Sequence, residues 1–100
     1  MYKILFFLHK TDDEDFLQLF KDNTVKKLEE IIGKDVGIAE VESNLLLEQK
    51  YTYYCEISTS SKEEMDRKMN SKAGKELNKS LMDFHKDITV VVVNYSQEKK

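Results

Sequence analysis

The order in which strand patterns and helix patterns follow one another limits the fold of this chain more than any other feature. Residues 2–9, 36–41, 51–57 and 88–93 are short segments rich in β-branched or aromatic residues, as strands are. Two longer segments between them carry apolar side chains at steps of three and four residues, the spacing of one helix face. The predicted order is therefore strand, helix, strand, strand, helix, strand.

The first helix has a predicted start and a predicted end. Thr11 stands three residues before Glu14, which is the spacing of a capping box, and the acidic run 12–15 lies where a helix dipole favours negative charge. Gly33 predicts the end of the helix, because glycine tolerates the positive φ that often closes one. Between these signals one apolar face is formed by Phe16, Leu19, Phe20, Leu28, Ile31 and Ile32.

The second helix shows the same kind of start. Ser61 and Glu64 repeat the capping-box spacing. The apolar stripe that follows consists of Met65, Met69, Ala73, Leu77, Leu81 and Phe84. Asn70 and Ser71 can cap a second helix, so the sequence leaves two alternatives open: one continuous helix, or a helix interrupted at these residues.

The third strand alternates between two faces. One face is predicted to carry Tyr51, Tyr53, Cys55 and Ile57, and the other Thr52, Tyr54 and Glu56. Before this strand, the sequence leaves three placements open for Leu45, Leu46 and Leu47: an extension of the strand 36–41, a flap, or part of a hairpin connection.

This element order indicates one fold. Right-handed crossovers leave the split βαβ arrangement as the simplest solution. We therefore predict an α+β fold, a ferredoxin-like βαββαβ sandwich with an antiparallel four-stranded sheet. At 100 residues the chain has room for one core, so residues 1–95 are predicted to form a single domain and residues 96–100 a polar tail.

The first and last predicted strands are apolar on both faces. In the first strand, Leu5 and Phe7 point to one face and their apolar neighbours point to the other. The valines 90–93 also alternate between the two faces. Helices on one side of the sheet leave the other side uncovered, and such a patch exceeds what monomers normally expose. The pattern predicts a homodimer in which two sheets pack face to face.

Charge and cysteine content argue against several classes of protein. Sixteen basic and nineteen acidic residues give a net charge of −3, so no basic field attracts nucleic acid or an anionic membrane. Residues 50–54 also lack the glycine and the aromatic spacing of an RNA-recognition motif. Cys55 is the only cysteine, and the longest apolar run, residues 4–8, is too short to cross a membrane. We expect a cytoplasmic protein that binds neither nucleic acid nor membrane.

Four stretches of the chain are similar to the sequences of a known protein family. They are residues 2–5, 16–28, 54–57 and 65–84, and the last contains Asn70-Ser71-Lys72-Ala73-Gly74-Lys75. In these stretches the chain resembles the EthD-like family of the dimeric α/β-barrel superfamily, from Tyr2 to Tyr95. The resemblance implies a dimer whose two sheets form a shared barrel, with helices outside and a small-molecule pocket in each protomer. Members of that family usually carry a His, a small residue and a Pro in the first helix, where this chain has Thr24, Val25 and Lys26. Chemistry that depends on that imidazole is therefore not expected.

Two histidines are candidate catalytic residues, because imidazole exchanges protons near neutral pH. They are His9, at the end of the first strand, and His85, at the end of the second helix. The alternatives are a surface position for His9 and an interaction with the helix dipole for His85. We expect both to meet Tyr53 and Thr24 at a pocket between the sheet and the helices.

Thr24, Tyr53 and Glu56 are the candidate ligand-binding residues. Glu56 is either a carboxylate facing water at a barrel rim or a buried acid with a raised pKa. Cys55 is expected to be an inert buried thiol.

The predicted function is binding of an apolar or aromatic small molecule, with activity as a cofactor-independent oxygenase, isomerase or lyase. The alternative is a ligand-binding or regulatory homodimer without catalysis. No metal-ligand spacing and no glycine-rich phosphate loop is present in the sequence, so no metal and no cofactor is expected.

Overall fold

The computed structural model describes residues 1–42 and 50–95. Its strands form one antiparallel sheet in the order β2-β3-β1-β4, and they are β1 (Tyr2–His9), β2 (Ala39–Glu40), β3 (Tyr51–Thr59) and β4 (Ile88–Asn94). The helical elements are α1 (Phe16–Phe20), the π-helical turn η1 (Lys21–Val25), α2 (Lys26–Ile32), α3 (Lys62–Met69) and α4 (Lys72–Asp83). The predicted α+β fold with its ferredoxin-like order is confirmed.

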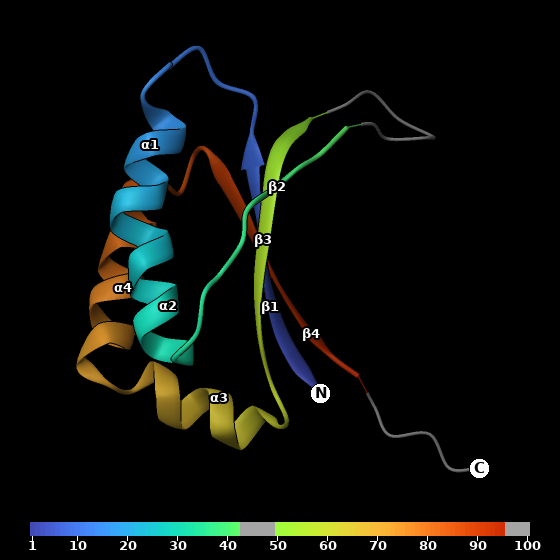
Figure 1. The fold of residues 1–100 in the computed structure, drawn as a ribbon, viewed down its shortest axis with the longest axis vertical. Coiled ribbons are helices and arrows are strands. Elements are labelled where there is room, and N and C mark those ends of the chain that lie inside the picture. Colours follow the sequence, from blue (N-terminus) through green and yellow to red (C-terminus); the bar gives the residue numbers. More distant parts are fainter. Residues whose placement is uncertain (43–49, 96–100) are drawn as a thin grey trace.

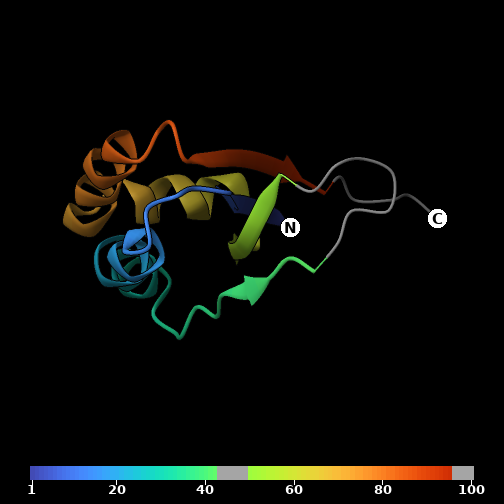
Figure 2. The ribbon, with the colours of Figure 1, turned by 90° about the horizontal axis from the view of Figure 1, so that it is seen from above.

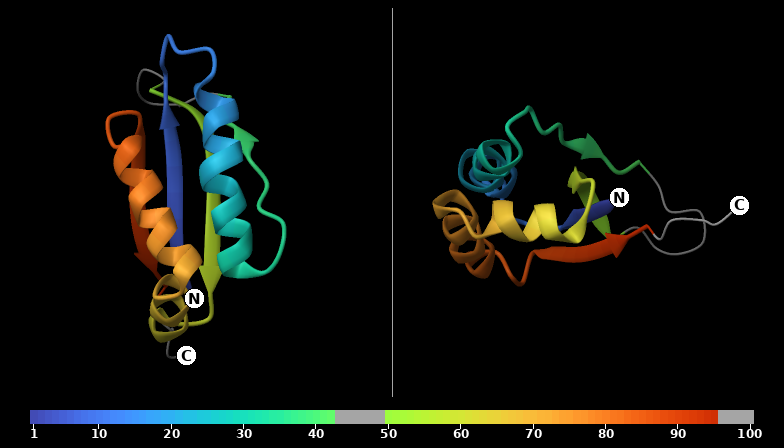
Figure 3. Two further views of the ribbon diagram at one scale, coloured as in Figure 1. Left: turned by 90° about the vertical axis from the view of Figure 1, so that its left-hand side faces the viewer. Right: turned by 90° about the horizontal axis from the view of Figure 1, so that it is seen from below.

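The helices lie together on one face of the sheet (Figures 1 and 2). The continuous segment α1-η1-α2 packs beside α4 over the strands, while α3 crosses near one end of the sheet (Figure 3). Within the described residues no helix covers the opposite face. Residues 1–42 and 50–95 therefore leave one side of the sheet uncovered.

Alternation along β1 places the core. Ile4, Phe6 and Leu8 are buried against the helices, and Cys55 and Ile57 lie beside them on β3. The helices contribute buried apolar side chains to the same cluster: Phe16, Phe20, Val25, Leu28, Ile31, Met65 and Leu77. Each fully buried side chain of this size stabilises the fold by roughly 1.5–3 kcal/mol, so this layer holds the sheet and helices together.

The first helix begins later than predicted. The capping box at Thr11 is wrong, because the Thr11 hydroxyl accepts a hydrogen bond from the backbone N–H of Asp13 at 3.2 Å. The Asp13 carboxylate in turn accepts one from the N–H of Asp15 at 2.9 Å. These local turns satisfy the backbone in a non-helical form and delay the helix to Phe16. Gly33 ends it as predicted, with φ +81°.

Of the two alternatives for the second helical segment, the structure has the interrupted one, with α3 ending at Met69 and α4 beginning at Lys72. The Ser61 hydroxyl accepts a hydrogen bond from the N–H of Glu64, and the Ser71 hydroxyl caps α4 by accepting one from the N–H of Gly74, both at 3.1 Å. The carboxylate of Glu64 bonds Ser60 instead of completing the box at Ser61. Two capped helices therefore replace one long one.

The strand predictions need two corrections. The paired part of the second strand is only Ala39–Glu40, shorter than the predicted 36–41. A register shift between Leu8 and His9 places Tyr51 opposite His9, so Tyr51 leaves the face of Tyr53. The leucines 45–47 lie outside the described residues. In the described part of the chain, no helix is long and apolar enough to cross a membrane.

Candidate functional site

The uncovered side of the sheet, which we call the open face, carries an unusual number of apolar and aromatic side chains. Strand register places on it Lys3, Leu5, Phe7, His9, Tyr51, Tyr54, Glu56, Thr89, Val91 and Val93. The Phe7 ring lies 5.0 Å from the rings of both Tyr51 and Tyr54. Val91 remains 39% exposed, although it stands in the middle of β4. The open face thus has the composition of an interface.

His9 is at one end of this aromatic cluster. Its Nε2 lies 2.6 Å from the Thr89 hydroxyl, and its ring centroid is 5.6 Å from that of Tyr51. The imidazole is half-buried and held by a neighbouring strand on each side. His9 is therefore an oriented residue of the open face.

Glu56 is on the same face, in a three-residue network. Its carboxylate accepts a hydrogen bond from Lys3 Nζ at 3.0 Å and another from the Tyr54 hydroxyl. These two donors, first Tyr54 and then Lys3, lower the pKa of Glu56, whereas burial and the carboxylate raise the pKa of Tyr54. The alternative of a buried acid with a raised pKa is wrong, because both neighbours favour the charged form.

This network predicts a stability contribution that depends on pH. Since the folded pKa of Glu56 is lowered, its contribution is present above the ordinary carboxyl pKa of about 4.3 and is lost as pH falls through the folded value. Urea unfolding should show Glu56→Gln to be less stable than the wild type at neutral pH, and the difference should shrink as the pH falls below the ordinary carboxyl pKa. If the difference in stability between the two proteins does not change with pH, the ion pair of Lys3 and Glu56 is not its cause.

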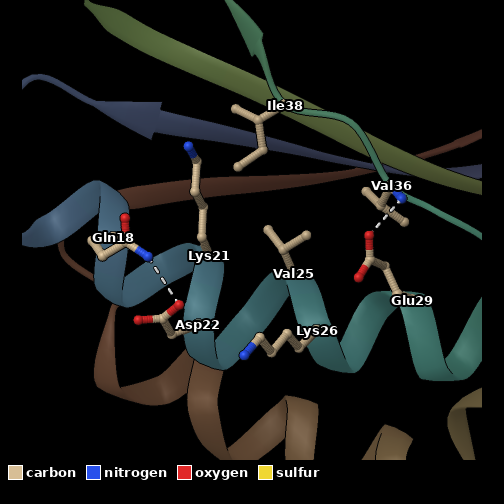
Figure 4. Close-up of a pocket in the computed structure, with 8 residues that line it drawn as sticks. All are labelled: Gln18, Lys21, Asp22, Val25, Lys26, Glu29, Val36 and Ile38. Carbon is tan, nitrogen blue, oxygen red and sulfur yellow. Dashed lines mark hydrogen bonds between the residues drawn. The ribbon is translucent and has the colours of Figure 1, made fainter.

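A second candidate site is the cleft between the first helical segment and the chain leading into β2 (Figure 4). It has a volume of about 390 Å³ and is lined by Gln18, Lys21, Asp22, Val25, Lys26, Glu29, Val36 and Ile38. Ligand pockets usually start near 300 Å³. We call this feature the cleft, and its size suits a small organic molecule.

The π-helical turn supplies three side chains of the cleft, namely Lys21, Asp22 and Val25. Such turns are rare and occur frequently at functional sites. One signal for this turn is present in the sequence: the first apolar residue after Phe20 is Val25, five residues later, a step that a regular α-helical face does not make.

The floor of the cleft is apolar and its polar groups are at the sides. Val25 is buried, Val36 and Ile38 are half-buried, and Figure 4 shows the three side chains turned toward one another. Glu29 accepts a hydrogen bond from the backbone N–H of Val36 at 3.0 Å, which ties the approach to β2 onto the helix. This combination can hold an apolar body and leave its polar end near solvent.

The remaining candidate residues lie elsewhere and do not converge. Tyr53 lines a smaller hollow of about 220 Å³, together with Thr52 and the start of the first helical segment, and neither histidine lines it. Thr24 is fully buried on the opposite side of the π-helical turn, with its hydroxyl 3.1 Å from that of Ser80. His85 is exposed beyond α4, with Nδ1 2.9 Å from the Met82 carbonyl oxygen.

Cys55 has the environment of an inert thiol. It is 1% exposed and unpaired, and burial raises its pKa to about 12. A thiol with such a pKa is not a nucleophile near neutral pH. Within residues 1–42 and 50–95, no group of three or more His, Cys, Asp or Glu side chains is placed to hold a metal ion.

The fold of this chain is similar to folds of solved protein structures. No family model and no curated protein matches the sequence. A crystal structure of an ethyl tert-butyl ether D (EthD) family protein from Bacillus halodurans C-125 superposes with a TM-score of 0.74 at 21% identity, covering 96% of this chain and 99% of that one. The chain has the EthD fold.

Two further structures share this EthD fold. A protein from Arabidopsis thaliana matches with a TM-score of 0.62 at 22% identity, over 99% of this chain and 96% of its own. HapK from Hahella chejuensis matches with a TM-score of 0.57 at 11% identity, over 100% and 97%. At these identities the similarity establishes the fold, and the resemblance predicted from the sequence is confirmed at that level.

Proposed function

We propose that this protein is a homodimer that binds an apolar or aromatic small molecule in the cleft of each protomer. The observation that carries the proposal is the π-helical turn, which interrupts a helix and places Val25 and two charged side chains at a cavity of ligand size. The similarity to an EthD family protein supports a small-molecule role at the level of the fold.

The open face supports the dimer half of the proposal. Phe7, Tyr51 and Tyr54 form a connected aromatic cluster, and aromatic residues are enriched at the centres of protein interfaces. Leu5, Val91 and Val93 extend this cluster across β1 and β4. A second copy offers the same surface, because a twofold interface is self-complementary.

Binding in the cleft can be tested with a neutral ligand, 4-phenylbutan-1-ol, by titration calorimetry. Ile38→Ser should weaken its binding about tenfold, since the ligand loses the apolar contact of one side chain. Val92→Ser is the matched control, because Val92 is exposed on β4, at the opposite edge of the sheet from β2, and does not line the cleft. Equal loss in both variants, or no binding by the wild type, would contradict the proposal.

Catalysis is the second candidate function, and His9 is the observation that favours it. Its imidazole is oriented by Thr89 and lies against the Tyr51 ring, on the face that the dimer would enclose. An oxygenase, isomerase or lyase reaction resting on proton transfer by His9 should be abolished by His9→Gln while ligand binding in the cleft persists. Product formation that is unaffected by His9→Gln excludes this role.

A further inference from the structure

Two lysines stand at the cleft without a carboxylate partner. Lys21 and Lys26 are both exposed, and within the part of the chain that the structure describes neither forms an ion pair. The two acidic side chains of the cleft are already engaged: Asp22 accepts a hydrogen bond from the Gln18 amide at 2.9 Å, and Glu29 accepts the one from Val36 at 3.0 Å. The ammonium groups of Lys21 and Lys26 therefore remain available to a ligand.

The direction of Lys21 makes it the better placed of the two. Figure 4 shows its side chain extending from the π-helical turn toward the sheet, on the same side as Ile38, while Asp22 turns toward Gln18. The apolar floor of Val25, Val36 and Ile38 lies beside it. An ammonium group at the end of an apolar floor is the arrangement that an amphipathic anion requires.

We infer that the ligand of the cleft is a small carboxylic acid, with an apolar or aromatic body on Val25, Val36 and Ile38 and its carboxylate at Lys21. This inference rests on the proposed function and narrows it to one class of ligand.

The charge balance of the cleft disfavours a ligand with two negative charges. Lys21 and Lys26 are offset by Asp22 and Glu29, so the ionisable lining of the cleft sums to zero. One carboxylate can pair with Lys21 without approaching the acidic side chains closely. A doubly charged phosphate would be repelled by them more strongly, since like charges in a partly enclosed site raise the energy of binding.

The test compares three probes that differ only in the polar end: 4-phenylbutyrate, 4-phenylbutyramide and 4-phenylbutan-1-ol. Titration calorimetry at neutral pH should show the acid binding about fivefold more tightly than the amide or the alcohol, as a partly exposed ion pair allows. Lys21→Met should abolish this preference and leave binding of the alcohol unchanged, whereas Lys21→Arg should retain it. Lys86→Met, which alters an exposed lysine that does not line the cleft, should behave as the wild type.

The outcomes separate the inference from the function on which it rests. Equal affinity for all three probes, or an acid preference that survives Lys21→Met, overturns the carboxylate inference and leaves small-molecule binding standing. Absence of binding by all three probes contradicts both. A thermal unfolding measurement on each variant confirms that the protein compared is folded.

Discussion

Replacing Gly74 by alanine is expected to destabilise the protein by about 3 kcal/mol or more. A Cβ at this position would lie 2.1 Å from the Met69 carbonyl oxygen and 2.5 Å from its carbonyl carbon. Both atoms are backbone, so no side-chain rotation relieves the contact, and α3 and α4 must move apart. That movement also disturbs the cap in which the Ser71 hydroxyl accepts the N–H of Gly74. Urea unfolding followed by circular dichroism measures the loss.

Gly37→Ala is the matched control for this substitution. No heavy atom lies within 4 Å of a Cβ at Gly37, and its φ is not in the left-handed region. The change should alter stability by no more than about 0.5 kcal/mol. If Gly74→Ala and Gly37→Ala unfold at the same urea concentration, the close approach of α3 and α4 does not exist in solution.

Val91→Asp is expected to convert the dimer to a monomer. The wild type should scatter light with about twice the 11.8 kDa chain mass, and the variant with the mass of one chain. Val91 lies opposite Leu5 on the open face, and in a twofold interface each dimer would bury two aspartates without partners. Burying these two charges costs more free energy than the loss of the valine contacts alone.

Val92→Asp separates the two faces of β4. Val92 is the next residue, is 54% exposed, and lies opposite Ile4 on the side of the sheet that carries the helices. This variant should remain dimeric, because its charge stays in water. If Val92→Asp dissociates the dimer and Val91→Asp does not, the interface lies on the side of the sheet that carries the helices. A monomeric wild type would contradict the dimer itself.

Much of the fold could be predicted because local signals agreed with tertiary packing. The β-branched run 88–93 forms β4, Gly33 ends the first helical segment, and Ser71 caps α4. The capping box predicted at Thr11 is wrong because this hydroxyl can accept a hydrogen bond from a nearby N–H in a turn as well as in a helix cap. Which of the two forms depends on how the chain leaves β1. Tyr51 was placed on the wrong face because a bulge moves one residue out of the alternation, and nothing local marks it.

The candidate site was harder to predict, since it depends on which side chains meet. His9 and Glu56 share the open face, but His85 lies outside the end of α4 and Thr24 is enclosed between two helices. Tyr53 lines a hollow that contains neither histidine. Lys21 and Ile38, which line the cleft, are ordinary residues in their own segments and become a site only when the π-helical turn and the approach to β2 are brought together.

The central claim is that a small molecule binds beside the π-helical turn, and amide chemical shifts test it most directly. Titration of ¹⁵N-labelled protein with 4-phenylbutan-1-ol should move the resonances of Lys21, Val25, Val36 and Ile38. The resonances of the open face, among them Tyr54 and Val91, should stay in place. Perturbations confined to the open face, with the cleft resonances unchanged at saturation, would contradict the account.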